Sequence, residues 1–356
     1  MSGIQAHGYA LVGTGKPLER CERWLEPGPG DAIIAVAGCG VCHTDIGFAV
    51  DGVPTRHPLP LVLGHEIAGR VVATGERAAG WQGEDVIVPA VIPCNACAAC
   101  RTGRHTICRR QFMPGNDGDG GFATHVRVPA NDLCPVPPHL PLGLALADLA
   151  VVADAVTTPY EAIRRAEVGP DDVAVFVGAG GVGGFGVQIA AARGAAVVAI
   201  DVDPARLELA SGHGAALALD ARNTDARKLK EAVRAFAKDC GRRGIGLRIF
   251  ECSGTPSGQD TAFALLDHGG HLGVVGYTPQ KVELRLSNLM ALDARAQGNW
   301  GCPPRYYPEA LSLVLDGKVV LGPYLEPHDL DAAPEVLAAV ASHALKKRPV
   351  LVPKAR

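Results

Sequence analysis

The chain has 356 residues and a formal net charge of −3, with 34 Lys and Arg against 37 Asp and Glu. So balanced a charge argues against a general nucleic-acid binder, which would carry a strong basic excess or a basic stripe. Hydrophobic residues make up 47% and charged residues 20% of the chain, which excludes intrinsic disorder. At about 100–200 residues per domain, the length predicts two domains.

The cysteines and the apolar runs indicate the cellular compartment in which the protein works. The 11 cysteines are too dilute for a disulfide scaffold, and their uneven spread suits metal binding under reducing conditions. The first residues lack the basic start and apolar core of a signal peptide. Residues 173–192 carry no formal charge and are long enough to span a bilayer, but the glycines clustered within them would break a membrane helix. We therefore expect a cytoplasmic protein with no membrane segment.

The first part of the chain, residues 1–150, is rich in Gly, Pro and Cys. Short β-like runs lie between turn signals, which predicts an irregular all-β region. These runs cover residues 32–36, 66–73, 85–90 and 123–128.

From about residue 155, apolar strand-like runs alternate with helical patterns, as in βαβ units of a parallel sheet. An amphipathic helix is expected after Thr224, with its apolar face on residues 229, 232, 233 and 236. A helix-like segment at 308–315 and a strand-like run at 349–352 follow, and we expect this short tail to pack onto the first region. The strand-like runs are residues 173–177, 196–200, 215–219, 247–250 and 271–275.

A glycine-rich segment follows the first of these runs and opens a helical pattern. It fits G-x-G-x-x-G, in which glycines let the backbone approach a pyrophosphate at a helix N-terminus. Asp201 ends the next strand-like run, where a carboxylate accepts hydrogen bonds from the adenosine ribose. This favours NAD over NADP, although Arg206 lies near enough to blur the preference. The alternative is a glycine-rich turn with an unrelated surface Asp. The coenzyme-binding candidates here are Gly178, Gly180, Gly181, Val182, Gly183, Asp201 and Arg206.

Four cysteines share one short segment, with the spacing C-x2-C-x2-C-x7-C: Cys94, Cys97, Cys100 and Cys108. Four thiolates complete a closed tetrahedral zinc shell, so such a site is structural. An iron–sulfur cluster also uses four cysteines, but its bacterial signature has a different last spacing and a following proline. Disulfides are disfavoured in a cytosolic chain.

Two further segments carry candidate metal ligands. Cys42 lies in G-V-C-H-T-D and His65 in G-H-E. Spacing alone makes this a modest signal, because a lone histidine before a β-run is more often an ordinary hydrogen-bonded group.

In this order, the four motifs resemble those of the zinc-dependent medium-chain alcohol dehydrogenases, over essentially the whole chain. The resemblance implies an α/β fold: an irregular GroES-like β catalytic domain and a Rossmann coenzyme domain with a doubly wound parallel sheet. We expect the catalytic domain at residues 1–155 and 296–356 and the NAD-binding domain at 156–295. It also implies two zinc ions per chain, one catalytic and one structural, and a homodimer or homotetramer.

The resemblance also implies the ligands of the catalytic zinc. Cys42 and His65 match two of them, and Asp154 falls where the family commonly has a cysteine, a departure that zinc chemistry allows. Glu66 matches a residue that either approaches the zinc transiently or stays outside the ligands, without contacting the metal. Cys39 resembles a ligand by spacing, but the family pattern assigns it to packing.

Other positions acquire expected roles by the same matching. Thr44 corresponds to the hydroxyl that relays the proton from the zinc-bound substrate oxygen, and His43 and Arg348 to groups that meet the coenzyme pyrophosphate. For Arg348, a lysine-rich surface face is the alternative. Gly276 corresponds to a position that passes close to the nicotinamide. Gly47 stands where many members have a relay histidine, so the proton must leave through His57, through the ribose and water, or through the substrate.

Three stretches suggest a substrate: residues 112–123, 153–160 and 297–301. They resemble the 6-hydroxycyclohex-1-ene-1-carbonyl-CoA dehydrogenases of anaerobic benzoyl-CoA degradation, which implies oxidation of an allylic ring alcohol on an acyl-CoA thioester. Basic side chains could meet the coenzyme A phosphates, although a solvated basic face is the commoner explanation for such a cluster: Arg101, Arg104, Arg109 and Arg110.

Other functions stay open. A simple alcohol, a polyol or a formaldehyde-type substrate is the alternative within the family. A non-catalytic NAD-binding sensor, or a zinc-free quinone reductase, would not require the metal-binding residues. We expect no nucleic-acid partner.

Overall fold

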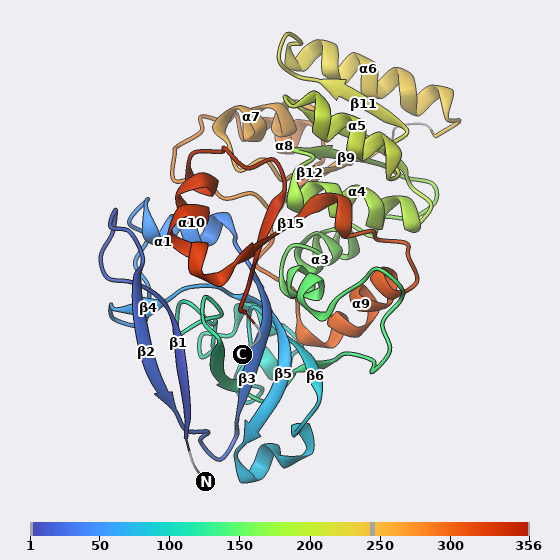
Figure 1. Cartoon of the computed structure of the whole chain (residues 1–356). Helices are drawn as coiled ribbons and strands as arrows, with labels where there is room; N and C mark the ends of the chain where they lie inside the picture. Colours follow the sequence, from blue (N-terminus) through green and yellow to red (C-terminus); the bar gives the residue numbers. More distant parts are fainter. Residues whose placement is uncertain (1–2, 243–245, 355–356) are drawn as a thin grey trace. The chain divides into compact units, whose positions relative to one another are not determined.

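The computed structural model describes residues 3–242 and 246–354 and divides the chain into two compact units (Figure 1). Unit 1 comprises Met1–Thr157, Gly301–Leu315 and Leu325–Arg356, and unit 2 comprises Thr158–Trp300 and Asp316–Tyr324. Both boundaries lie slightly later in the chain than the sequence predicted.

The segment Asp316–Tyr324 differs from the expectation, which placed the whole tail in the first domain. Within unit 2, the ring of Tyr324 packs on Phe185 with ring centroids 5.2 Å apart. The side chain of Gln188 bonds both the backbone N–H and the carbonyl of Val320. These contacts place residues 316–324 of the tail in unit 2.

Unit 1 is built around a sheet of seven strands, in the order β15-β16-β3-β5-β6-β8 with β7 paired to β3. A smaller sheet, in the order β2-β1-β4, stands beside it as the dark blue hairpin in Figure 1. The strands are β1 (Ile4–Leu11), β2 (Glu19–Leu25), β3 (Asp31–Gly40), β4 (Leu61–Val62), β5 (Glu66–Thr74), β6 (Asp85–Val88), β7 (His125–Pro129), β8 (Cys134–Pro135), β15 (Leu325–Asp329) and β16 (Arg348–Val352).

Short helices fill the remainder of unit 1. The 3₁₀ helix η3 (Leu146–Ala153) contacts β3 and β5, and Leu149–Ala153 are fully buried. A rigid core segment therefore leads directly to Asp154. The other helices are α1 (His43–Ala49), α2 (Ala98–Arg101), α9 (Tyr307–Leu315) and α10 (Ala333–Ala341), with the 3₁₀ helices η1 (Glu76–Trp81), η2 (His105–Ile107), η4 (Pro304–Tyr306) and η6 (Leu330–Ala332).

Unit 2 is a parallel sheet of six strands, in the order β11-β10-β9-β12-β13-β14. The first strand of the unit, β9, lies in the middle, so the strand order reverses between β9 and β12. The strands are β9 (Val173–Val177), β10 (Ala196–Asp201), β11 (Leu217–Asp220), β12 (Arg248–Glu251), β13 (His271–Val274) and β14 (Arg295–Gly298). The helices are α3 (Thr157–Arg165), α4 (Gly181–Ala192), α5 (Pro204–Gly212), α6 (Ala226–Asp239), α7 (Pro256–Ala264) and α8 (Ser287–Ala291), with the 3₁₀ helix η5 (Gly322–Tyr324).

Both faces of this sheet are covered. Every residue of β9 is buried, which explains why the sequence shows a continuous apolar run there rather than an alternation. On one face, Phe176 stacks on Phe250 of the neighbouring strand at 4.9 Å. The predicted fold class, an irregular β domain with a Rossmann-like parallel sheet, is confirmed.

No helix within residues 3–242 and 246–354 combines the length and apolar character that crossing a membrane requires.

Candidate active site

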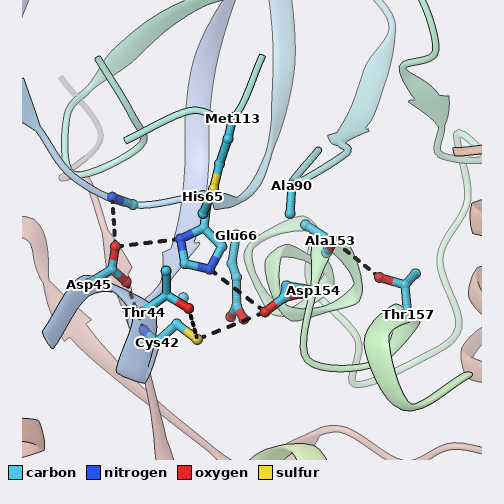
Figure 2. A network of polar contacts seen from close by, with 12 residues as sticks. Cys42, Thr44, Asp45, His65, Glu66, Ala90, Met113, Ala153, Asp154 and Thr157 are labelled. Atoms are coloured by element: carbon cyan, nitrogen blue, oxygen red, sulfur yellow. Dashed lines mark hydrogen bonds and ion pairs between the residues drawn. The ribbon is translucent and has the colours of Figure 1, made fainter. Parts of the chain in front are cut away.

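Four side chains of unit 1 converge in Figure 2: Cys42, His65, Glu66 and Asp154. Each offers one donor atom, and the four donors lie within 4.8 Å of one another. Asp154 Oδ2 lies 3.8 Å from Cys42 Sγ and 3.7 Å from His65 Nε2. With zinc bonds of about 2.0–2.3 Å, the edges of a tetrahedral shell measure about 3.3–3.8 Å. The donor set therefore fits zinc.

The backbone explains how these donors meet. Cys42 immediately precedes α1, His65 precedes β5, and Asp154 follows η3. Gly64 has a φ of +96°, and a Cβ there would lie 2.7 Å from Cys39 Sγ. Cys39 is therefore a packing residue beneath the histidine's turn, as the family pattern implies.

Asp45 ties the cysteine and histidine segments together. Its Oδ2 accepts the Cys42 N–H at 2.9 Å, and its Oδ1 accepts the Gly64 N–H at 3.1 Å. The same Oδ1 lies 3.5 Å from His65 Nδ1. A carboxylate at Nδ1 leaves Nε2 free to face Asp154 and a metal. The fully buried Asp45 thus orients the imidazole.

Glu66 and Arg348 form a buried ion pair beside this cluster. Arg348 Nε donates to Glu66 Oε2 at 2.9 Å, and its Nη2 donates to Oε1. Arg348 is 9% exposed, so the alternative of a solvated lysine-rich face is wrong for this residue. Its predicted contact with the coenzyme pyrophosphate stays a prediction.

His43 and Thr44 begin α1. Thr44 Oγ1 lies 3.8 Å from Cys42 Sγ, which puts the hydroxyl next to the proposed metal position. The exposed His43 ring stacks on His343, with ring centroids 5.6 Å apart. Gly47 is buried within α1, and the exposed His57 has its Nδ1 2.7 Å from the Pro58 carbonyl oxygen.

The four-cysteine cluster is assembled on one loop of unit 1. The sulfurs of Cys94, Cys97, Cys100 and Cys108 lie within 4.8 Å of one another, with Cys97 to Cys100 at 3.5 Å and Cys97 to Cys108 at 3.8 Å. Backbone N–H groups, that of Ala96 first, lower the pKa of Cys94 to about 6. Burial and the neighbouring thiols raise the pKa of Cys100 to about 12. Four sulfurs crowded in this way suit a closed zinc shell.

The glycine fingerprint forms a tight turn at the carboxyl end of β9. Gly178 has φ +94°, and a Cβ there would lie 2.5 Å from the Ser253 backbone nitrogen. A Cβ on Gly183 would lie 1.8 Å from the Gly178 carbonyl oxygen. Helix α4 begins at Gly181, after the N-cap Gly180, and Val182 is half-buried in its first turn. The turn thus presents a helix N-terminus at the switch in strand order, where such sheets bind ligands.

Asp201 ends β10 and is nearly buried, at 6% exposed. Its Oδ2 accepts the Ala179 N–H at 2.7 Å, and its Oδ1 accepts the N–H groups of Val202 and Asp203 at 2.8 and 2.9 Å. The carboxylate therefore holds the glycine turn in place. Arg206 Nη1 lies 4.0 Å from Asp201 Oδ1, so the arginine lies beside this carboxylate, and its effect on the choice between NAD and NADP stays a prediction.

Gly276 follows β13, where a side chain has no room. A Cβ there would lie 2.3 Å from the Gly254 nitrogen and 2.7 Å from Glu251 Oε2. Its N–H donates to the Glu251 carbonyl at 2.9 Å. Gly276 thus lies at the same carboxyl edge of the sheet as the fingerprint.

Comparisons with known proteins agree with this picture. Residues 28–138 match the family model "Alcohol dehydrogenase GroES-like domain", and residues 181–316 match "Zinc-binding dehydrogenase". An alcohol dehydrogenase of Rhizobium meliloti is 32% identical over 86% of this chain and 87% of its own. An L-threonine 3-dehydrogenase of Streptomyces avermitilis is 31% identical over 84% of this chain and 85% of its own.

A solved structure extends the likeness to three dimensions. A putative zinc-binding dehydrogenase of Sinorhizobium meliloti, bound to NADP, has a TM-score of 0.84 and 26% identity, covering 98% of this chain and 100% of its own. The chain belongs to the zinc-dependent medium-chain alcohol dehydrogenase family. It is accordingly an oxidoreductase that works with zinc and a nicotinamide dinucleotide.

Proposed function

We propose that this enzyme oxidises a secondary alcohol to a ketone with NAD as acceptor, at a zinc site formed by Cys42, His65 and Asp154. The observation that carries the proposal is the mutual approach of a thiol, an imidazole and a carboxylate from three separate elements, at distances that suit a tetrahedral shell. These three residues would hold a zinc ion with one coordination position left open, and the bound zinc would supply Lewis-acid polarisation of the substrate oxygen.

The chain's own residues supply orientation and proton transfer. Asp45 fixes the imidazole of His65 and the peptide of Cys42, so both donors keep their direction while substrate enters. The Thr44 hydroxyl, which lies beside Cys42, relays the proton of the substrate alcohol to water, through His57 or through the coenzyme ribose. Glu66 remains paired with Arg348 and keeps a second negative charge near the metal position.

Unit 2 supplies coenzyme binding. The N-terminus of α4 and the bare backbone of the glycine turn receive the pyrophosphate. Asp201, at the end of β10, accepts from a ribose hydroxyl and disfavours a 2′-phosphate. His43 and Arg348 contribute cations to the pyrophosphate, and Gly276 leaves room for the nicotinamide. In solution the enzyme is a homodimer or homotetramer, as is usual in the family.

The proposed substrate is 6-hydroxycyclohex-1-ene-1-carbonyl-CoA, oxidised to the 6-oxo thioester. The support is the resemblance of residues 112–123, 153–160 and 297–301 to the dehydrogenases that act on it. Exposed arginines around the cysteine cluster would meet the coenzyme A phosphates: Arg101, Arg104, Arg109 and Arg110. A simple alcohol, a polyol or a formaldehyde-type substrate is the alternative.

The test is NAD reduction, followed as NADH absorbance, with the cyclic hydroxy-enoyl-CoA beside a panel of simple alcohols, polyols and formaldehyde. We expect the thioester to give the highest kcat/KM. Turnover of simple alcohols with none on the thioester would refute the substrate while leaving the enzyme class intact. An absence of NADH with every substrate, in protein carrying its zinc, would favour a non-catalytic NAD-binding sensor.

A further inference from the structure

Tyr307 is a buried tyrosine whose hydroxyl group hydrogen-bonds to the peptide that precedes Asp154. It opens α9 and is 1% exposed. Its hydroxyl donates to the Ala153 carbonyl oxygen and accepts the Ala90 N–H at 3.1 Å. The same Ala153 carbonyl also accepts the Thr157 hydroxyl at 3.1 Å (Figure 2). The Ala153 carbonyl oxygen thus accepts hydrogen bonds from two side-chain hydroxyl groups, at the buried end of η3.

The position of this carbonyl matters because it belongs to the peptide bond that joins Ala153 to Asp154. Asp154 itself lies beyond the regular part of η3, with φ −140° and ψ −57°. Its backbone direction, and hence where its carboxylate points, depends on how that peptide plane is held. Figure 2 shows the Asp154 carboxylate directed toward Cys42 and His65 and the Ala153 carbonyl directed toward Thr157.

We propose that Tyr307 is a positioning residue for the third zinc ligand: its hydroxyl fixes the Ala153–Asp154 peptide and thereby aims the Asp154 carboxylate at the metal. The inference rests on the proposed role of Asp154. It extends the site to α9, a segment 154 residues further along the chain, which contributes no ligand itself. The side chain of aspartate is shorter and less flexible than that of glutamate. The orientation of its backbone therefore determines whether its carboxylate oxygen reaches the metal.

The hydroxyl, rather than the ring, carries this role. Phenylalanine would keep the buried ring of α9 but would leave the Ala90 N–H without its acceptor and the Ala153 carbonyl with one donor fewer. Buried backbone groups find partners wherever the chain can shift to do so, so the peptide of Asp154 is expected to rotate. Substitution of a group that holds a metal ligand in position typically lowers metal affinity by about 10–100-fold.

The experiment compares zinc release from the wild type and Tyr307→Phe, using a chelating dye and the holoenzyme. We expect about tenfold weaker zinc binding at the Asp154 site, and unchanged release from the four-cysteine cluster, which serves as an internal reference. Asp154→Ala identifies which release phase belongs to this site. Cobalt exchanged into the same site should show shifted visible absorption bands in Tyr307→Phe, a change that mere loss of stability would not cause.

Tyr324→Phe is the matched control, because the Tyr324 hydroxyl is buried without a hydrogen-bond partner among the described residues. It should leave both zinc sites unchanged. Thr157→Val, which removes the second donor to the Ala153 carbonyl, should weaken zinc in the same direction and keeps the test usable if Tyr307→Phe fails to fold. Wild-type zinc affinity and cobalt bands in Tyr307→Phe would overturn the inference. If the wild type itself holds no zinc at Asp154, the proposed function fails instead.

Discussion

Asp154 is the proposed third ligand of the catalytic zinc. Its carboxylate lies 3.8 Å from the Cys42 sulfur and 3.7 Å from the His65 nitrogen. An oxygen donor binds zinc less softly than a thiolate but within the same coordination geometry. The side chain is 18% exposed, which suits a ligand that faces an open substrate position.

Replacing Asp154 tests this role directly. Asp154→Ala should lower the zinc content from two to about one per chain, because it leaves the catalytic site with two ligands. Asp154→Cys supplies a thiolate at the same backbone position and should retain more zinc than the alanine variant. Metal analysis after gel filtration makes the measurement. Unchanged zinc content in Asp154→Ala would refute the role.

The Glu66–Arg348 pair is the other notable residue-scale feature. Both side chains are buried and joined by two hydrogen bonds, so removing one partner leaves an uncompensated charge. Glu66→Gln should lower the free energy of unfolding by about 3–5 kcal/mol. The double variant Glu66→Gln with Arg348→Met should lose less than the two single variants add up to. Urea unfolding of the wild type, the two single variants and the double variant measures the coupling energy. Additive losses of stability would contradict an energetic coupling between the two charges.

At the scale of elements, the sequence predicted the buried strands of unit 2 closely. The run 173–177 became β9, with identical bounds, because a doubly covered strand needs uninterrupted apolar residues. β14 was not predicted: its residues, Arg295–Gly298, are all exposed and carry no apolar pattern. Pairing with β13 creates that strand, and pairing is not visible in a single segment.

The turn between β9 and α4 is the element of unit 2 that we propose to bind the coenzyme pyrophosphate. Gly183→Ala should abolish or weaken NADH binding at least tenfold, because the added Cβ would lie 1.8 Å from the Gly178 carbonyl oxygen. Gly212→Ala is a matched control in α5 of the same unit, where a Cβ meets nothing within 4 Å. NADH fluorescence titration measures both, and equal affinities would contradict the assignment.

Three basic residues lie side by side at the amino ends of neighbouring strands in unit 2. His271 of β13 pairs in register with Arg248 of β12 and Arg295 of β14. Burial first, and then these two arginines, lower the pKa of His271. Arg248 is in turn paired with Asp172 at 3.3 Å. The folded protein therefore prefers the neutral imidazole.

This preference predicts a pH dependence of stability. Below the ordinary histidine pKa of about 6.5, the unfolded chain binds a proton that the folded chain resists. His271 should therefore contribute a loss of stability as the pH falls through and below about 6.5, with a slope of at most about 1.4 kcal/mol per pH unit. The difference in unfolding free energy between wild type and His271→Gln, measured at pH 7.5 and 5.5, should shift against the wild type at pH 5.5. A pH-independent difference would contradict this.

At the scale of the whole molecule, the candidate site was predictable only in part. The four-cysteine cluster is local in sequence, so spacing alone indicated it. Cys42, His65 and Asp154 lie on separate elements, and only the family resemblance grouped them. Arg348 follows two lysines, which made a surface face plausible, and its pairing with Glu66 arises from β16 and β5 in one sheet. Tyr307 carries no motif, since its role lies in a single hydroxyl group.

The two units divide the proposed chemistry between them. Unit 1 contains both metal-binding clusters, and unit 2 contains the glycine turn and Asp201. In the proposed function, zinc binds to unit 1 and the NAD phosphates bind chiefly to unit 2. Variants in the glycine turn should leave zinc content intact, and variants of the zinc ligands should leave the glycine turn intact.

The zinc content of the purified wild-type chain tests the central claim most directly. Inductively coupled plasma mass spectrometry, with protein concentration from amino-acid analysis, gives zinc atoms per chain. The account predicts two: one held by Cys42, His65 and Asp154, and one held by Cys94, Cys97, Cys100 and Cys108. One zinc atom per chain, or none, in protein purified without chelators would contradict it.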